Sequence, residues 1–166
     1  MDVFIEKVIS RKKTRFDYIL MGALISIWLY IAIFTFSLRI FVDLFFIVDV
    51  LLLVGLVFVI RGRNVEFEYA ITNGDLDIDK IIAKRKRKRL FSANCRDFDI
   101  VARVTHESFN EAKKIQKKII AISSKDSPDI YFLTVNYKEE KTLVIFEPDE
   151  RMMKAFKIYI PKKVFD

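Results

Sequence analysis

The chain has 166 residues, with 29 Lys or Arg against 22 Asp or Glu, and therefore a formal net charge of +7. Its one cysteine, Cys95, excludes an intramolecular disulfide framework. With one histidine, His106, it also argues against a structural zinc site, which usually needs four Cys or His ligands. We therefore expect no metal and no cofactor, and a reducing, cytoplasmic location for the soluble part.

Two long apolar segments lie near the N-terminus. Residues 18–38 carry no charged side chain, and residues 44–60 carry only Asp49. A helix needs roughly 20 apolar residues to cross the hydrocarbon core, and two helices joined by a short turn satisfy their backbone amides internally. We predict a transmembrane helical hairpin over residues 16–61, with helices at about 18–38 and 41–60. A cleaved signal peptide fits poorly, because the first segment is longer than an h-region and no cleavage site follows.

Basic residues beside the apolar segments set the expected orientation. Residues 1–15 form a basic N-terminal segment, and Arg61 and Arg63 follow the second apolar segment. In the predicted tight turn, around Ser37–Asp43, Arg39 is the one basic residue. Because Lys and Arg stay on the cytoplasmic side, the pattern predicts a multi-pass protein of the cell membrane with both termini in the cytoplasm.

Asp49 is a carboxylic acid inside a predicted span, where such residues are costly and often functional. Folding the hairpin about residues 39–40 brings Asp49 level with Tyr30. One interpretation is a protonated or hydrogen-bonded side chain, partnered by Tyr30 or reaching towards the outer interface. The other is a proton or ion relay, or a contact to another membrane subunit or a second copy of the chain.

The pattern changes to strands at residue 65. Val65, Phe67, Tyr69 and Ile71 alternate with polar or small residues, and Asn73–Gly74 is a strong hairpin signal. We predict a short helical stretch from Ser108, with Glu111 completing a capping box, that ends near residues 114–118. The strand-like runs, bounded by turn residues, are 65–72, 75–82, 90–95, 98–104, 118–123, 130–137 and 142–147.

The last predicted element is an amphipathic helix over residues 148–160. Pro148 suits the first helical turn, the stripe that includes Met152, Phe156 and Tyr159 is apolar, and Pro161 ends the helix. The fold class is therefore an α+β membrane protein: a transmembrane hairpin, then an antiparallel seven-stranded barrel or sandwich over residues 64–166, closed by the C-terminal helix.

Two segments resemble a known type of protein. Tyr69–Lys80 (YAITNGDLDIDK) and residues 146–161 (FEPDERMMKAFKIYIP), together with two preceding apolar helices, are similar to small bacterial membrane proteins with a pleckstrin-homology-like (PH-like) domain. The resemblance implies membrane association with scaffolding or lipid contact. It implies no shared catalytic residues, so no functional residue is carried across by position.

The most conspicuous local feature is a run of six cations: Lys84, Arg85, Lys86, Arg87, Lys88 and Arg89. Alternation places the lysines on one strand face and the arginines on the other. The run fits a solvated edge or hairpin end, where charge blocks aggregation. It also fits attraction to anionic lipid headgroups or a protein partner. Nucleic acid, which a basic chain can also attract, is disfavoured because no platform of stacking aromatics accompanies the run.

Patterns of catalysis and metal binding are weak. Asp75, Asp77 and Asp79 are followed by lysines where a calcium loop needs Gly and Glu. His106 and Ser108 are close in sequence, but a catalytic arrangement requires spatial geometry that adjacency does not supply. No glycine-rich phosphate loop can be written with four glycines at these spacings. We expect no enzyme and no catalytic residues.

Two functions remain open from the residues. The first is a membrane-anchored binding or scaffolding module whose soluble domain contacts anionic lipid or a protein. The second is an accessory subunit of a membrane transporter or envelope complex, recognised through the hairpin and motivated by Asp49.

Overall fold

A computed structural model describes residues 4–38 and 42–165 of the chain. It divides into two compact units, which we describe separately. One unit is made of residues 12–64 and is helical, and we call it the helical unit. The other combines residues 1–11 with residues 65–166 and contains both sheets, and we call it the β unit.

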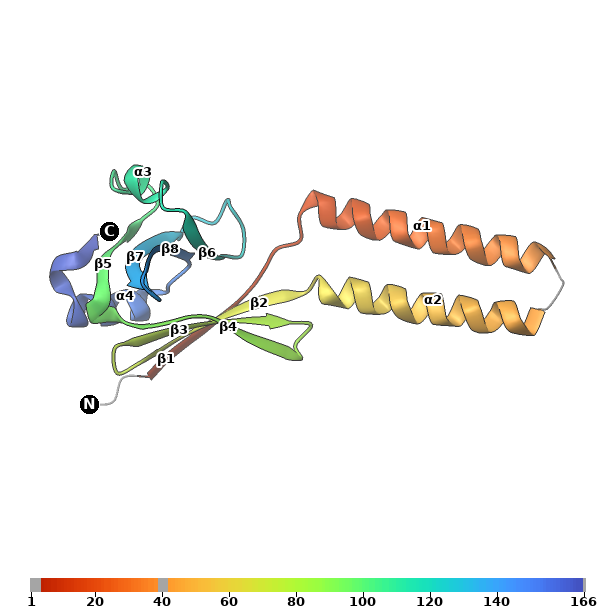
Figure 1. The fold of residues 1–166 in the computed structure, drawn as a ribbon, viewed down its shortest axis with the longest axis horizontal. Coiled ribbons are helices and arrows are strands. Elements are labelled where there is room, and N and C mark those ends of the chain that lie inside the picture. Colours follow the sequence, from red (N-terminus) through yellow and green to blue (C-terminus); the bar gives the residue numbers. More distant parts are fainter. Residues whose placement is uncertain (1–3, 39–41, 166) are drawn as a thin grey trace. The chain divides into compact units, whose positions relative to one another are not determined.

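The helical unit consists of helices α1 (Arg15–Leu38) and α2 (Val42–Gly62), which pack as an antiparallel pair (Figure 1). Along α1, the half-buried side chains recur every three or four residues, as expected for one helix face packed on another. By length and composition, the segment Arg15–Ser37 could cross a membrane; it is the one such helix among the described residues. The predicted second crossing stays a prediction, and the centre of the predicted turn, with Arg39, lies outside the described residues.

The β unit begins with a strand that the sequence analysis did not assign. Strand β1 (Phe4–Ser10) pairs antiparallel with β2 (Val65–Thr72) along its whole length. Ile5 and Ile9 pack against the core of the unit, which gives the segment its place in the sheet. Residues 1–15 are therefore more than a basic tail, and the helical unit is inserted between two neighbouring strands of one sheet.

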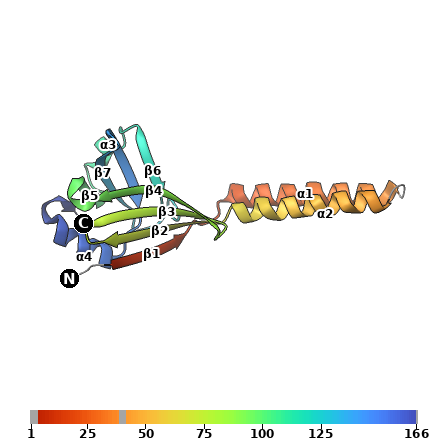
Figure 2. The same ribbon diagram turned by 60° about the horizontal axis from the view of Figure 1, so that its bottom comes forward.

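The first sheet is a meander with the order β1-β2-β3-β4, in which β3 is Asp75–Ile82 and β4 is Lys86–Asn94 (Figure 2). Asn73 and Gly74 connect β2 to β3 with positive φ at both positions, as the predicted tight turn requires. Strand β4 starts four residues before the predicted run and contains most of the basic residues. A register shift marks a bulge at Leu90 of β4, opposite Ile78 and Asp79 of β3.

The second sheet has the order β6-β8-β7-β5-β9. The expectation of purely antiparallel strands is wrong here, because β6 pairs parallel with β8 and β5 pairs parallel with β9. The structure thus has two sheets and nine strands among its described residues, where seven strands were predicted. The bounds are β5 Phe98–Arg103, β6 Lys117–Ala121, β7 Tyr131–Tyr137, β8 Glu140–Phe146 and β9 Val164–Phe165.

Helix α4 (Glu150–Tyr159) buries its apolar stripe in the core of the β unit, as predicted. It starts later than expected, because Asp149 is the N-cap and its side chain accepts a hydrogen bond from the Met152 backbone N–H at 2.8 Å. The short helix α3 (Phe109–Ala112) has Ser108 at its N-cap, but the Ser108 side chain makes no capping hydrogen bond, so the predicted capping box is absent there. Single 3₁₀ turns lie at Cys95–Asp97 and Pro161–Lys163.

The turn between β7 and β8 offers a test of local strain. Lys138 and Glu139 both adopt positive φ (54° and 65°), a conformation that costs side-chain-bearing residues roughly 1 kcal/mol or more each. Lys138→Asn with Glu139→Gly should raise the free energy of unfolding by about 1–2 kcal/mol, because Asn-Gly suits this turn. Urea denaturation of the full chain in mild detergent measures the gain, and an unchanged midpoint would show that the turn is unstrained.

Candidate functional site

The six-cation run of residues 84–89 is divided by the structure into two sets. The first set, Arg87 and Arg89, bonds to carboxylates on the same sheet. Arg87 donates to Glu68 Oε2 at 2.7 Å, and Arg89 lies 2.8 Å from Asp77 Oδ1. Arg89 also forms a close ion pair with Asp79. These two arginines are therefore neutralised within the β unit.

Strand register explains why the arginines and the acids meet. Asp79 lies directly opposite Glu68 on β2 and opposite Arg89 on β4, so the three charges share one face of the sheet. Asp79 and Glu68 are buried, which makes paired cations necessary because an uncompensated buried charge is costly. The hydrogen bond that Arg89 donates to Asp79 raises the pKa of Arg89 above its usual value. Asp79 of β3 is thus part of a buried set of ion pairs that crosses three strands of the sheet.

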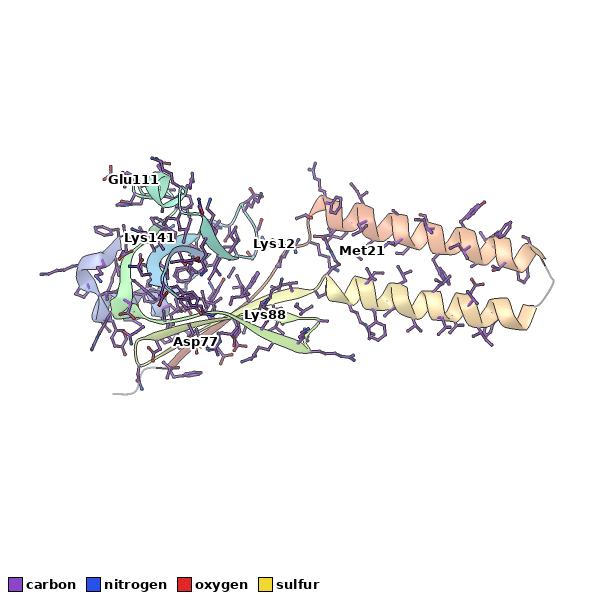
Figure 3. All side chains as sticks on the ribbon, in the orientation of Figure 1. Lys12, Met21, Asp77, Lys88, Glu111 and Lys141 are labelled. Atoms are coloured by element: carbon purple, nitrogen blue, oxygen red, sulfur yellow. The ribbon has the colours of Figure 1, made fainter. Side chains whose placement is uncertain are left out.

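The second set contains the other four cations, Lys84, Arg85, Lys86 and Lys88, and we call it the free set. All four are exposed, and none makes an ion pair or a side-chain hydrogen bond with any residue in the described part of the chain. Lys88 and Asp77 are labelled in Figure 3 on the first sheet. The free set lies in the tight β3–β4 turn and at the start of β4.

Register also fixes which end of the sheet carries the free set. Ile82, the last residue of β3, pairs with Val65 on one side and with Lys86 on the other. Arg11 donates its backbone N–H to Val65 at 2.8 Å, so the exit of β1 lies at this same end. The free set therefore occupies the sheet end at which the chain leaves for residue 12 and returns after residue 64.

Asp49 has a different partner from the one predicted. Thr35 Oγ1 donates to Asp49 Oδ2 at 2.8 Å, and Trp28 Nε1 donates to the Asp49 backbone carbonyl at 3.2 Å. Tyr30 is 71% exposed, on a different face of α1. The prediction placed Asp49 at nearly the correct level along α1 but on the wrong helix face. Trp28 and Thr35, seven residues apart, lie on the face that packs against α2, whereas Tyr30 does not. The other carboxylate oxygen, Asp49 Oδ1, is buried and has no hydrogen-bond partner among the residues that the structure describes.

An ion pair that sequence reasoning missed joins the two helices near residues 15 and 62. Arg63 Nε donates to Asp17 Oδ1 at 2.8 Å, and Asp17 is buried. Asp17 also accepts from the Thr14 backbone N–H at 2.9 Å, while Thr14 Oγ1 caps the Asp17 amide at 3.4 Å. The Thr-x-x-Asp spacing was a readable capping signal in the sequence. The arrangement fixes the open end of the helix pair with a partnered charge.

The remaining polar residues serve packing in the β unit. The Tyr69 hydroxyl donates to the Ala121 carbonyl and accepts the Glu147 backbone N–H at 3.3 Å, which ties the two sheets together. Glu147 is buried and accepts from the Ser123 backbone N–H at 2.7 Å. Burial raises the pKa of the Cys95 thiol to about 12, so it is a poor nucleophile at neutral pH.

His106 and Ser108 do not form a nucleophile–base pair. The Ser108 backbone N–H, and not its hydroxyl, donates to His106 Nδ1 at 3.3 Å. The His106 ring packs beside Phe165 with 5.2 Å between centroids. Across residues 4–38 and 42–165, no three His, Cys, Asp or Glu side chains gather as metal ligands would.

A cleft of about 630 Å³ lies in the β unit beside the N-terminus of α4. Its charges are mixed: Arg103, Lys154 and Asp149 contribute to its wall. Lys7 also lines it, but its Nζ donates to the Glu147 carbonyl at 2.9 Å and so is already bonded. The cleft has no concentrated charge of one sign, and the free set at the β3–β4 turn is the stronger candidate site.

Comparison with known proteins gives one result. The sequence profile of a family described as a bacterial PH-like domain (DUF6106) matches residues 1–166. No curated protein and no solved structure matches the chain.

Proposed function

Because the chain belongs to the DUF6106 family of bacterial PH-like domains, we propose that it is a membrane-anchored, non-enzymatic binding or scaffolding module. In this proposal, α1 and α2 both cross the cell membrane, and both termini face the cytoplasm. The β unit then presents a binding surface at the membrane, for anionic lipid headgroups or for a protein partner.

The surface of the helical unit carries the anchoring part of the proposal. Among the described residues, ten large apolar side chains of α1 and eleven of α2 are exposed. Soluble proteins rarely expose so large a continuous apolar surface. Hydrocarbon covers it without further structure, because a helix satisfies its own backbone hydrogen bonds. The ion pair between buried Asp17 and half-buried Arg63 suits the water–lipid boundary, where a charge needs either solvent or a partner.

The β unit supports binding rather than catalysis. The one histidine, His106, packs against Phe165, and the thiol of Cys95 is fully buried. The four cations of the free set, which make no ion pair within the described residues, gather at one end of the first sheet. Such a cluster favours recognition of an anionic surface.

A second candidate function rests on Asp49. Its buried Oδ1 has no partner within the described residues, and a polar atom in hydrocarbon is stabilised by a hydrogen bond from a neighbouring helix. This observation favours an accessory subunit that joins a larger membrane complex through the helix pair, or a homo-oligomer.

Membrane fractionation with cysteine labelling tests the anchor. We expect the chain to stay in the pellet after carbonate extraction, and Lys162→Cys to react with a membrane-impermeant maleimide in inverted vesicles only. Cys95 supplies no background, because it is fully buried. Recovery in the soluble fraction without detergent would refute anchoring, and labelling in intact cells would refute the orientation.

The same material separates the two candidates. A stoichiometric second protein, or an oligomer, in mild detergent that disappears with Asp49→Leu supports the subunit function. A monomer that retains lipid, unchanged by Asp49→Leu, supports the binding module alone.

A further inference from the structure

We infer that Lys84, Arg85, Lys86 and Lys88 bind the anionic headgroups of the same membrane that holds the helix pair, while Arg87 and Arg89 do not. This inference rests on the proposed anchoring and adds the ligand, its source and the residues that contact it. The basic run is then not one patch of six cations. Four of them bind headgroups, and the other two form ion pairs within the sheet.

The two sets of cations differ in the acidic residues beside them. Glu68, Asp77 and Asp79 together bond to Arg87 and Arg89, so this part of the sheet is close to neutral. The free set has no such acids, and its charges face solvent. A phosphate headgroup can therefore approach the free set without displacing an existing ion pair. At Arg87 or Arg89 it would first have to break a pair that includes the buried Asp79.

The connection between α2 and β2 is short. The free set begins two residues after Ile82, which pairs with Val65, and α2 ends at Gly62. The two residues between Gly62 and Val65 can span at most roughly 10 Å from Cα to Cα, whatever the angle between the units. If α2 ends at the membrane surface, this sheet end is held close to the headgroups by covalent length alone. Arg61, just before the strand, adds positive charge at the boundary, whereas Arg63 is already paired with Asp17.

Local backbone geometry also supports the inference. The β3–β4 turn is tight, with Ala83 and Lys84 at positive φ (52° and 57°) and a hydrogen bond from the Arg85 N–H to the Ile82 carbonyl at 3.1 Å. Only the three residues 83–85 connect the paired strand ends, so the cations are presented together without ordering a long loop. Binding then costs little conformational entropy beyond that of the side chains.

The occupant is a lipid surface rather than nucleic acid. The four side chains are flexible cations with no aromatic residue among them, whereas single-stranded nucleic acid is bound through stacking platforms. Phospholipid headgroups need only dense negative charge at a plane, and each basic residue near that plane gains about fivefold in affinity.

Lysine acetylation in lipid nanodiscs tests the inference on the native full chain. We expect Lys84, Lys86 and Lys88 to acetylate about fivefold more slowly with 30% phosphatidylglycerol than with phosphatidylcholine alone, since amines paired with phosphate react poorly. High salt should remove the difference, because it screens exposed charges. Lys162 is the internal control: it is exposed, and its neighbour Lys163 bonds to the carbonyls of Arg96 and Phe98, beyond the opposite end of β4.

A charge-matched pair of variants gives an independent measurement. Lys84→Gln, Lys86→Gln and Lys88→Gln together should halve or abolish the phosphatidylglycerol that stays with the chain after purification in mild detergent. Lys114→Gln, Lys154→Gln and Lys162→Gln together remove the same charge from other exposed sites and should leave it unchanged.

The outcomes distinguish the inference from the function on which it rests. Equal acetylation in both lipids, or equal lipid loss in the two triple variants, would overturn the headgroup contact while leaving the anchor intact. A chain that does not enter nanodiscs at all would overturn the anchor itself. Protection in both lipids that salt does not change would mean steric burial, and would also overturn the charge-based contact.

Discussion

Phe156→Ala should lower the free energy of unfolding of the β unit by about 3–5 kcal/mol. Phe156 is fully buried, and its ring packs edge-to-face on Phe98 and Phe146 at centroid distances of 6.3 and 6.1 Å. These contacts pack α4 against β5 and β8 of the second sheet. Removing the ring leaves a cavity and loses its dispersion contacts as well.

Ile158→Ala, on the same helix, is the matched control. Ile158 is 74% exposed, so its truncation should change stability by no more than about 0.5 kcal/mol. Urea denaturation in mild detergent, with pulsed thiol labelling of the buried Cys95 as a reporter of the β unit, measures both variants. Equal midpoints for the two variants would contradict the packing of α4 described above.

Alkaline pH should destabilise the β unit by about 4 kcal/mol between pH 8 and pH 11. Burial raises the pKa of Cys95 to about 12, and burial also raises the pKa of Tyr69 well above its usual value of about 10. Below pH 8 both groups are neutral in the folded and unfolded chain, so their contribution to stability is fully present. As pH rises, the unfolded chain ionises first, at Cys and then at Tyr, and stability falls until the folded-state pKa values are reached.

Tyr69→Phe provides the control for this pH dependence. The variant loses the hydroxyl that joins the sheets, so it should be less stable at pH 8 by about 1–2 kcal/mol. Above pH 10, its stability should fall less steeply than that of the native chain, by about 1.4 kcal/mol per pH unit. Near-ultraviolet circular dichroism during urea titration at each pH follows both proteins. Parallel slopes would show that Tyr69 ionises as easily in the folded chain as in the unfolded one.

Local signals predicted the elements of the fold that depend on neighbouring residues. The alternation of residues 65–71 and the Asn73–Gly74 turn were sufficient for β2 and β3, and the stripe through Phe156 was sufficient for α4. These patterns arise from burial on one face, which the sequence records directly.

Strand β1 could not be read in the same way. Its inward residues include Lys7, and its outward ones include Phe4 and Val8, which are 67% and 50% exposed. The alternation of polarity is thus lost, and its partner β2 is separated from it by residues 11–64. The signal that makes β1 a strand is a long-range pairing, which a local pattern does not contain.

Alternation predicted that the lysines and arginines of the run lie on opposite strand faces, but not which side chains pair with acids. That pairing depends on the register between β3 and β4, which a bulge in β4 opposite Ile78 and Asp79 shifts by one residue. The partner of Asp49 depends similarly on the rotation of α1. Tyr30 and Thr35 lie about 140° apart around the helix axis, and Thr35 is the one that faces Asp49.

The placement of the helices between β1 and β2 also determines when the first sheet can form during synthesis. Strand β1 leaves the ribosome before residues 11–64 and has no partner until β2 has followed them. In a membrane-anchored chain, the first sheet therefore closes only after the apolar segments have been delivered to the bilayer. A nascent chain whose delivery fails retains an unpaired strand edge, the kind of surface that aggregates and is recognised as unfolded.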